Sequence, residues 1–450
     1  MREAYRSQQS IESPWLDLDH AAELRVISGL LDRCVDVLEL ALADLELSPC
    51  GSSSGARGLS ADQVVRAMII KQMNDFSYRQ LEFHLADSRT YRNFCKLSSS
   101  AWSPKKSCLA ASIKALQPET LEAIHRRIIE VAVELGVDDG RRVRVDATVV
   151  KSNIHHPTDS ELLWDCVRVL TRLVMRAKEI VGANILPVSN RTRRAKKRRR
   201  QINSVHRKAH RIGPYRDLIR VTEEVRGHAE MALAVLAKSE DPRAPKLIAK
   251  LECFHDRSGK VVDQTRRRVL EGESVPAKEK LVSIFEEHTD IIRKDARETL
   301  YGHKICLTAG SSSLVFDCTV LHGNPADSTL AVDTVKRFIE ITGEPPRQIV
   351  FDGGFSSKQN LADIKEAGAQ DVVFSKSRGI PISDMASSSW VYKTLRHFRA
   401  GIEGIISFLK RAFGLDTCKW RSLPSFNSYV WSSILTSNLL VTARHLLENS

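Results

Sequence analysis

The sequence lacks any pair of cysteines at the C-x-x-C spacing of zinc sites and redox motifs. Its nine cysteines are scattered, so we expect no disulfide framework and no zinc site, but mostly buried thiols in a reducing cytoplasm. The N-terminus has no signal-peptide pattern. The longest uncharged run, Phe426 to Ala443, is threaded with Ser, Thr and Asn, which predicts a packed helix and no membrane span.

Acidic residues are absent from one stretch, residues 191–211, which holds 11 Lys or Arg. The formal net charge of the chain is +13, so this run carries most of the excess. Clustered cations neutralise phosphates and make binding salt-dependent. A solvated loop or a localisation signal is the other interpretation of such a run. We expect DNA contacts from Arg193, Arg194, Lys196, Lys197, Arg198, Arg199 and Arg200.

The N-terminal third of the chain predicts short helices. Residues 17–47 carry apolar residues at helical spacing, and a Gly/Ser-rich linker follows at 48–58. Ser60 with Gln63 forms a capping-box pattern. Further helices are expected at 64–73, 78–86, from about 107, and at 118–135. Short helices with tight breaks fit a helix-turn-helix-like domain over 59–137, although a bundle that only scaffolds or dimerises fits nearly as well.

Strand patterns begin near residue 140. Residues 142–150 alternate with period two and are rich in β-branched side chains, yet Asp146 lies among them. A helical block over 158–290 interrupts the pattern, with helices expected at about 158–185, 214–238 and 263–270. A hairpin around residues 310–312 follows, in which Asp317, between Phe316 and Cys318, is expected to face outward. Helices from Asn324 and Lys358 and strands at 348–352 and 371–375 come next. This order predicts a mixed α/β sheet flanked by helices, with a helical insertion after the first strand.

Three acids on three elements, Asp146, Asp352 and Glu403, are expected to meet at one end of that sheet, because ligands bind off the carboxyl ends of such strands. On the helix from Arg396 to Arg411, Arg399 and Lys410 share a face with Glu403. A surface ion pair between Arg399 and Glu403 is the simpler interpretation of that helix alone.

Carboxylates suit hard cations, and two Mg²⁺ ions, or Mn²⁺ in their place, would serve phosphoryl transfer. We therefore treat Asp146, Asp352 and Glu403 as candidate catalytic and metal-binding residues. Lys376 and Arg378, just past the end of a strand, are candidates for holding a DNA phosphate together with Arg399 and Lys410.

Several motifs resemble the DDE transposases of bacterial insertion sequences. They cover about residues 59 to 447, and the spacing of Arg399, Glu403 and Lys410 is similar to the R-(3)-E-(6)-K signature of that family. One departure is Arg396, where the signature has Tyr; Tyr392 lies one turn earlier. The other matching stretches are Asp146-Ala147-Thr148-Val149-Val150, Asn153-Ile154-His155, Pro157-Thr158-Asp159-Ser160, Gly323-Asn324-Pro325-Ala326-Asp327-Ser328 and Phe351-Asp352-Gly353-Gly354-Phe355.

The resemblance implies an RNase H-like catalytic domain at 138–450, interrupted by the insertion at 158–290. It also implies a DNA-binding domain at 59–137 that recognises terminal inverted repeats, and the residue pattern places an N-terminal helix and linker before it at 1–58. The reaction would be metal-dependent nicking at the element ends and strand transfer into target DNA, by a homodimer on the bacterial nucleoid. A nuclease of the same fold without strand transfer, or a decayed DNA-binding copy, are the rival functions.

Overall fold

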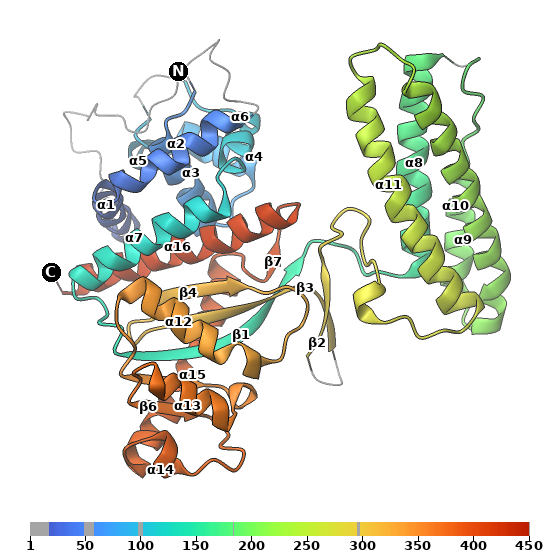
Figure 1. Cartoon of the computed structure of the whole chain (residues 1–450). Coiled ribbons are helices and arrows are strands. Elements are labelled where there is room, and N and C mark those ends of the chain that lie inside the picture. Colours follow the sequence, from blue (N-terminus) through green and yellow to red (C-terminus); the bar gives the residue numbers. More distant parts are fainter. Residues whose placement is uncertain (1–17, 49–57, 98–101, 183, 295–297, 450) are drawn as a thin grey trace. The chain divides into compact units, whose positions relative to one another are not determined.

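The computed structural model describes residues 18–48, 58–97, 102–182, 184–294 and 298–449 (Figure 1). The chain forms two compact units: Met1–Asn153 together with His303–Ser450, and Ile154–Gly302. The second unit therefore interrupts the first in sequence. Nearly all of the linker expected at residues 48–58 lies outside the described residues. No helix within the described ranges is long and apolar enough to cross a membrane.

The first unit begins with helices, as the sequence predicts. Ser60 and Gln63 form the expected capping box, because the Gln63 amide donates to Ser60 Oγ and the Ser60 amide donates to Gln63 Oε1. The short helix α5 was not predicted. The helices are α1 (Asp19–Asp32), α2 (Leu38–Leu47), α3 (Ala61–Met73), α4 (Tyr78–Asp87), α5 (Arg89–Phe94), α6 (Lys106–Ile113) and α7 (Pro118–Glu134).

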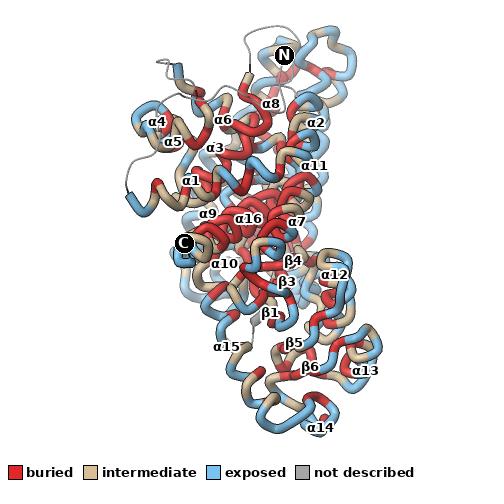
Figure 2. Tube along the Cα trace, turned by 90° about the vertical axis from the view of Figure 1, so that its left-hand side faces the viewer, coloured by how far each residue is buried: buried red, intermediate tan, exposed pale blue. Residues whose placement is uncertain are grey.

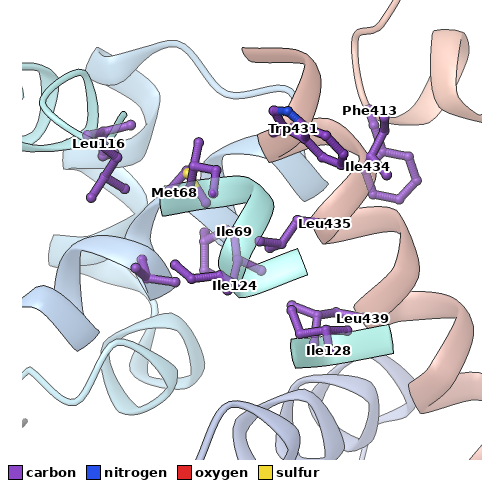
Figure 3. Close-up of a cluster of buried hydrophobic side chains, with 14 of the residues drawn as sticks. Met68, Ile69, Leu116, Ile124, Ile128, Phe413, Trp431, Ile434, Leu435 and Leu439 are labelled. Atoms are coloured by element: carbon purple, nitrogen blue, oxygen red, sulfur yellow. The ribbon is translucent and has the colours of Figure 1, made fainter. Parts of the chain in front are cut away.

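The uncharged run near the C-terminus forms helix α16 (Leu423–Glu448), which packs against α7, α1 and α3. Most of its residues are buried around the whole circumference, which Figure 2 shows as a nearly continuous buried tube. Figure 3 shows part of this core, where Leu435 and Leu439 of α16 lie near Ile124 and Ile128 of α7. Trp431 is buried there. Because α16 is buried on all sides by its neighbours, the N-terminal helices and α16 fold as one body.

The sheet of the first unit has the strand order β3-β1-β5-β6. β5 is parallel to β1 and β6 is parallel to β5, while β4 is antiparallel to β3 and the short β7 pairs with the end of β1. The sheet is therefore mixed. The strands are β1 (Arg142–Ser152), β3 (Glu298–Ala309), β4 (Val315–Val320), β5 (Gln348–Phe351), β6 (Asp371–Phe374) and β7 (Thr417–Cys418).

Four helices accompany this sheet: α12 (Ala331–Thr342), α13 (Lys358–Glu366), α14 (Ile382–Met385) and α15 (Ser389–Ala412). The strands and long helices expected here are present, whereas β7 and α14 were not predicted. One orientation was wrong. Asp317 of β4 was expected to face outward, but it is only 2% exposed and accepts two hydrogen bonds from Arg337 of α12 at 2.9 and 2.7 Å. The reason is that α12 covers this face of β4.

The second unit contains four long helices that lie side by side: α8 (Asp159–Val181), α9 (Thr192–Ser204), α10 (Lys208–Leu236) and α11 (Ala244–Thr265) (Figure 1). They enclose a hydrophobic core of their own. β2 (Asp290–Lys294) pairs with Glu298–Gly302, the first half of β3. The helix expected from about 263 to 270 was placed too late, because only the π turn Arg266–Leu270 follows Thr265. The helix expected from Pro214 starts earlier, and Pro214 lies inside it.

Candidate active site and basic helix

Strand register places two of the candidate acids side by side. β1 and β5 are parallel, and their pairing ends with Val145 opposite Phe351, so the next residues along the two strands are Asp146 and Asp352. β6 continues the same arrangement, because Phe351 pairs with Phe374 and Ser375 comes next. Ser375 Oγ donates a hydrogen bond to Asp352 Oδ1 at 2.9 Å. Both acids thus lie at the carboxyl edge of the parallel strands, where open α/β sheets bind ligands.

Helix α15, which packs on β1, β5 and β6, brings a cation and the third acid to this edge. Arg399 Nη2 lies 3.1 Å from Asp146 Oδ2 and 3.1 Å from Asp352 Oδ1. Arg399 Nη1 lies 3.5 Å from Glu403 Oε1. The side chains of Asp146 and Arg399 are 17% and 16% exposed, whereas Asp352 and Glu403 are 39% and 69% exposed. Three acids from three elements therefore surround one guanidinium that opens to solvent on the Glu403 side.

The Asp352 carboxylate is held in its charged form. Burial alone would raise its pKa, but hydrogen bonds from the Gly353 amide and Ser375, together with the charge of Arg399, lower the pKa below the ordinary value of 3.8. Asp146 Oδ1 accepts a hydrogen bond from the Ala147 amide at 2.8 Å. Both aspartates are thus fixed in orientation and ready to face a positive charge.

A buried arginine fixes the position of α15 on the sheet. Arg144 of β1 is 6% exposed, and its Nη1 donates to the Phe398 carbonyl at 3.0 Å while its guanidinium lies 4.5 Å from the centre of the Phe398 ring. Gly401 makes room for it, because a Cβ there would overlap Arg144 Nη1 and lie 2.9 Å from Cζ. Since Phe398 precedes Arg399, this contact sets where the guanidinium of Arg399 points.

The other cations expected at the site differ in position. Lys376 is exposed and lies over Gly353, where an added Cβ would come within 2.8 Å of Lys376 Cβ, so it stands next to Asp352. Arg378 is exposed in a turn with φ of +45°. Lys410 lies near Asp416. Burial raises the Asp416 pKa, but the Lys151 ion pair at 3.1 Å and the charge of Lys410 bring it below its ordinary value.

The position where the family signature has Tyr presents a cation here. Arg396 is exposed, and its guanidinium lies 5.7 Å from the centre of the Tyr392 ring. Tyr392 itself is 7% exposed and belongs to the hydrophobic core beneath the helix. The aromatic ring therefore supports Arg396 from below and is largely withheld from solvent.

Among the residues that the structure describes, no three His, Cys, Asp or Glu side chains are close enough together to hold a metal ion. At the candidate site the reason is that the guanidinium of Arg399 separates the carboxylates. The donor set itself suits a hard divalent cation, because it consists of carboxylate oxygens that already surround a positive charge.

The basic run of the second unit is a helix, α9, and its cations form two groups. The first group faces the neighbouring helices. Arg194 and Arg198 both pair with Asp217 of α10, the latter at 2.6 Å, and Arg199 pairs with Glu161 of α8 at 2.8 Å. These ion pairs attach α9 to the bundle. The solvated loop considered from the sequence is thus replaced by a packed helix.

The second group, which we call the outer stripe, consists of Arg193, Lys196, Lys197 and Arg200. Their spacing places them on one face of α9, and all four are exposed. None of the four has an ion pair within the described part of the chain. The outer stripe therefore presents four cations together to solvent.

Residues that sequence reasoning missed are those that support the site. Ser375, Arg144 and Gly401 carry no motif of their own. Ser375 could have been found only from the register of β6. Gly401 resembles any glycine in a helix, where its low helix propensity is slightly destabilising.

Comparison with protein families gives two matches. The model of a family described as "Transposase DDE domain" matches residues 256–439. This range includes Asp352, Arg399 and Glu403 and begins after Asp146. The description "Transposase domain (DUF772)" matches residues 16–114, within the N-terminal helices. No curated protein and no solved structure matches the chain. The two family matches, in the chain order that the sequence motifs predict, indicate an insertion-sequence DDE transposase.

Proposed function

We propose that this transposase cuts DNA at the ends of its own insertion sequence and joins those ends to target DNA. The observation that carries the proposal is that Asp146, Asp352 and Glu403, from β1, the end of β5 and α15, surround one guanidinium. A constellation that holds one half-buried positive charge among three carboxylates is suited to holding positive charge for phosphoryl transfer. The proposed catalytic fold is RNase H-like, which is supported by the mixed sheet and the acids at its carboxyl edge.

DDE transposases generally use divalent metal ions. Asp146, Asp352 and Glu403 would hold two Mg²⁺ here, and these ions would supply activation of the attacking oxygen and stabilisation of the leaving oxygen. Occupation requires Arg399 to leave the carboxylates. Its flexible side chain can then pair with a phosphate oxygen of the bound DNA, for which a guanidinium is geometrically suited.

In each of the two proposed steps, one bond to phosphorus forms as another breaks. In the first step water adds to the phosphorus at the element end, the bond to the 3′ oxygen breaks, and that oxygen leaves as a hydroxyl. In the second step this hydroxyl attacks a target phosphodiester, so that one phosphodiester bond forms as another breaks. The protein's own residues orient the DNA: Arg399 and the exposed Lys376 and Arg378 lie where they can contact phosphates beside Asp352. Lys410, further along α15, would contact a phosphate of the same DNA strand.

We further propose that the helical region at 59–137 binds the terminal inverted repeats, with a helix-turn-helix-like arrangement in which α6 enters the groove. Lys105 and Lys106 at the start of α6 are exposed, which supports this assignment. In this scheme residues 1–58 precede that domain, and 138–450 form the catalytic domain interrupted at 158–290. The outer stripe of α9 adds phosphate contacts. A homodimer on the nucleoid would hold both ends of the element.

The test uses the purified chain, Mg²⁺, and a DNA fragment that carries the flanks of its own gene. We expect joined products between the fragment and a target plasmid, and no joined products from Asp352→Asn at equal protein concentration. Asp363→Asn, a change of the same kind at a half-buried position of α13, is the matched control and should join strands normally. Nicks without joining would favour a nuclease, and specific binding without nicks would favour a decayed DNA-binding copy; either result contradicts the proposal.

A further inference from the structure

A second hollow lies at the opposite end of the parallel strands. Its lining includes the first residues of β1, β5 and β6, namely Arg142, Gln348 and Asp371, and it has a volume of about 720 Å³. Arg142 and Asp146 are four residues apart on one strand, so this pocket lies roughly 13 Å from the candidate active site. Helix α15 spans the same distance, since Trp390 at its start lines the pocket and Arg399 reaches the acids.

Two arginines in this pocket are each held by a glutamine, and the guanidinium of Arg142 also lies 5.7 Å from the centre of the Phe398 ring. Arg142 Nε donates to Gln348 Oε1 at 3.0 Å, and Arg347 Nε donates to Gln370 Oε1 at 3.0 Å. Neither guanidinium has an ion pair, and neither makes a hydrogen bond through its Nη atoms, with any residue that the structure describes. Both side chains are exposed. Such preoriented guanidinium ends are suited to phosphate oxygens.

The two acids that line the pocket accept hydrogen bonds from other residues of its wall. Asp371 is 5% exposed and accepts hydrogen bonds from Gln348 Nε2 at 2.9 Å and from the Ser387 amide at 2.7 Å. Asp139 accepts from the Arg141 amide at 3.0 Å. Because Lys365 also lines the pocket, the side presented to a ligand carries a net positive charge.

An aromatic side chain completes the pocket. Trp390 is 72% exposed, compared with 53% for Trp102, the other exposed tryptophan among the described residues. A single exposed apolar residue needs no explanation by itself. Here, however, the indole lines the same pocket as two preoriented guanidinium groups and a lysine. An exposed aromatic face next to a row of cations is the arrangement by which proteins bind single-stranded nucleic acid.

We propose that this pocket binds a segment of single-stranded DNA, with a base stacked on Trp390 and the neighbouring phosphates on Arg142 and Arg347. The inference takes the class of partner from the proposed function but assigns a site that is separate from the three carboxylates. Single-stranded DNA is favoured over an acidic peptide, because a peptide would use the cations and leave the indole without a stacking partner.

The experiment measures binding of a fluorescein-labelled oligothymidylate to the full chain by anisotropy, in EDTA, so that strand chemistry plays no part. Trp390→Leu keeps an apolar side chain but loses the aromatic face, and we expect about tenfold weaker binding. Trp390→Phe should retain most of the affinity. Arg347→Ala should lower the salt dependence by about 0.7 in the slope of log K against log salt. Lys336→Ala, an exposed lysine of α12 outside the pocket, is the matched control and should bind as the wild type does.

The proposal is overturned if Trp390→Leu binds the oligothymidylate as tightly as the wild type, with unchanged thermal unfolding of both proteins. It is also overturned if an oligoglutamate displaces the oligothymidylate and binds Trp390→Leu unchanged, since that result assigns the pocket to an acidic protein segment. A chain that joins no strands but shows the Trp390→Leu loss would refute the proposed function alone. The two outcomes are therefore distinguishable.

Discussion

Asp146 lies beside Asp352 because β1 and β5 run parallel in a register that pairs Val145 with Phe351. The two acids are far apart in the sequence, yet each is simply the residue that follows the last pair between the two strands. Their oxygens both lie 3.1 Å from Arg399 Nη2, so they can be no further from each other than twice that distance. The site therefore depends on strand register and on one arginine, and both can be tested.

Replacing Arg399 with Ala should destabilise the metal-free protein and increase its response to Mg²⁺. Without the guanidinium, the three carboxylates repel one another, and we expect a loss of about 1–2 kcal/mol in the free energy of unfolding in EDTA, since two of them are partly hydrated. Added Mg²⁺ should then stabilise Arg399→Ala more than the wild type, because no side chain competes for the carboxylates. Urea unfolding with and without Mg²⁺ measures both effects.

The matched control for that experiment is Arg411→Ala, because Arg411 is an exposed arginine of the same helix that donates a hydrogen bond to the Ser407 carbonyl of α15 itself. It should unfold as the wild type does. If Mg²⁺ raised the free energy of unfolding equally in Arg399→Ala and in the wild type, the guanidinium and the cation would not compete for the carboxylates.

Ser375→Ala should make the protein less stable near neutral pH, with the difference shrinking in acid. The Ser375 hydroxyl helps to lower the pKa of Asp352 below 3.8, so its contribution is present above that value and is lost as pH falls through the lower pKa of the folded state. Urea unfolding of both proteins at a series of pH values measures the difference. A difference that stays constant down to the acid limit would show that the hydroxyl does not act through the charge of Asp352.

Gly401→Ala should destabilise the protein, although alanine is the better helix former. The new Cβ would overlap Arg144 Nη1, and Arg144 cannot withdraw without losing its bond to the Phe398 carbonyl. Gly404→Ala on the same helix is the control, because a Cβ there meets nothing within 4 Å, and it should stabilise by about 0.5–1 kcal/mol. Thermal unfolding distinguishes the two. If both substitutions stabilise, Gly401 is not needed for the close approach of Arg144.

The outer stripe of α9 should bind DNA through phosphates alone. Changing Arg193, Lys196, Lys197 and Arg200 to Ala should weaken binding to DNA of any sequence and reduce the salt slope by up to about 0.9 for each lost contact. The double change Arg194→Ala with Arg198→Ala removes cations that Asp217 already engages, so it should mainly lower the unfolding temperature. Titrations of duplex DNA at several salt concentrations compare the two variants. Equal slopes for them would refute the division of the helix into two groups.

Much of this site could be predicted from local sequence, and the remainder depends on long-range packing. Asp146 was conspicuous because an acid is disfavoured in a strand, and Asp352 because it ends a buried run. The register that places them together could not be read, since β5 has only four residues and no alternation. Arg399 was expected to meet phosphate; its contact with the two aspartates follows from where Arg144 holds α15. Asp317 was misread because a hairpin strand with one open face was assumed.

The joint between the N-terminal helices and the sheet should make the protein sensitive to mild acid. His125 of α7 is fully buried, and its Nε2 lies 2.9 Å from the Val315 carbonyl of β4 and 3.0 Å from Asn438 Nδ2 of α16. Burial lowers the pKa of His125 to about 4 from 6.5. Between pH 6.5 and pH 4 the imidazole binds a proton in the unfolded chain but not in the folded chain. The free energy of unfolding is therefore at its full value above about pH 6.5 and falls as the pH is lowered toward 4.

His125→Gln removes this titration while keeping an amide that can donate to the Val315 carbonyl. We expect the variant to be less stable than the wild type at pH 7 but to lose less stability, by on the order of 3 kcal/mol, as the pH falls from 6.5 to 4. Urea unfolding across that range measures the slopes, and His397→Gln, at an exposed position of α15, should keep the wild-type slope. Identical slopes for His125→Gln and the wild type would mean that His125 is not what couples the helical region and the sheet to pH.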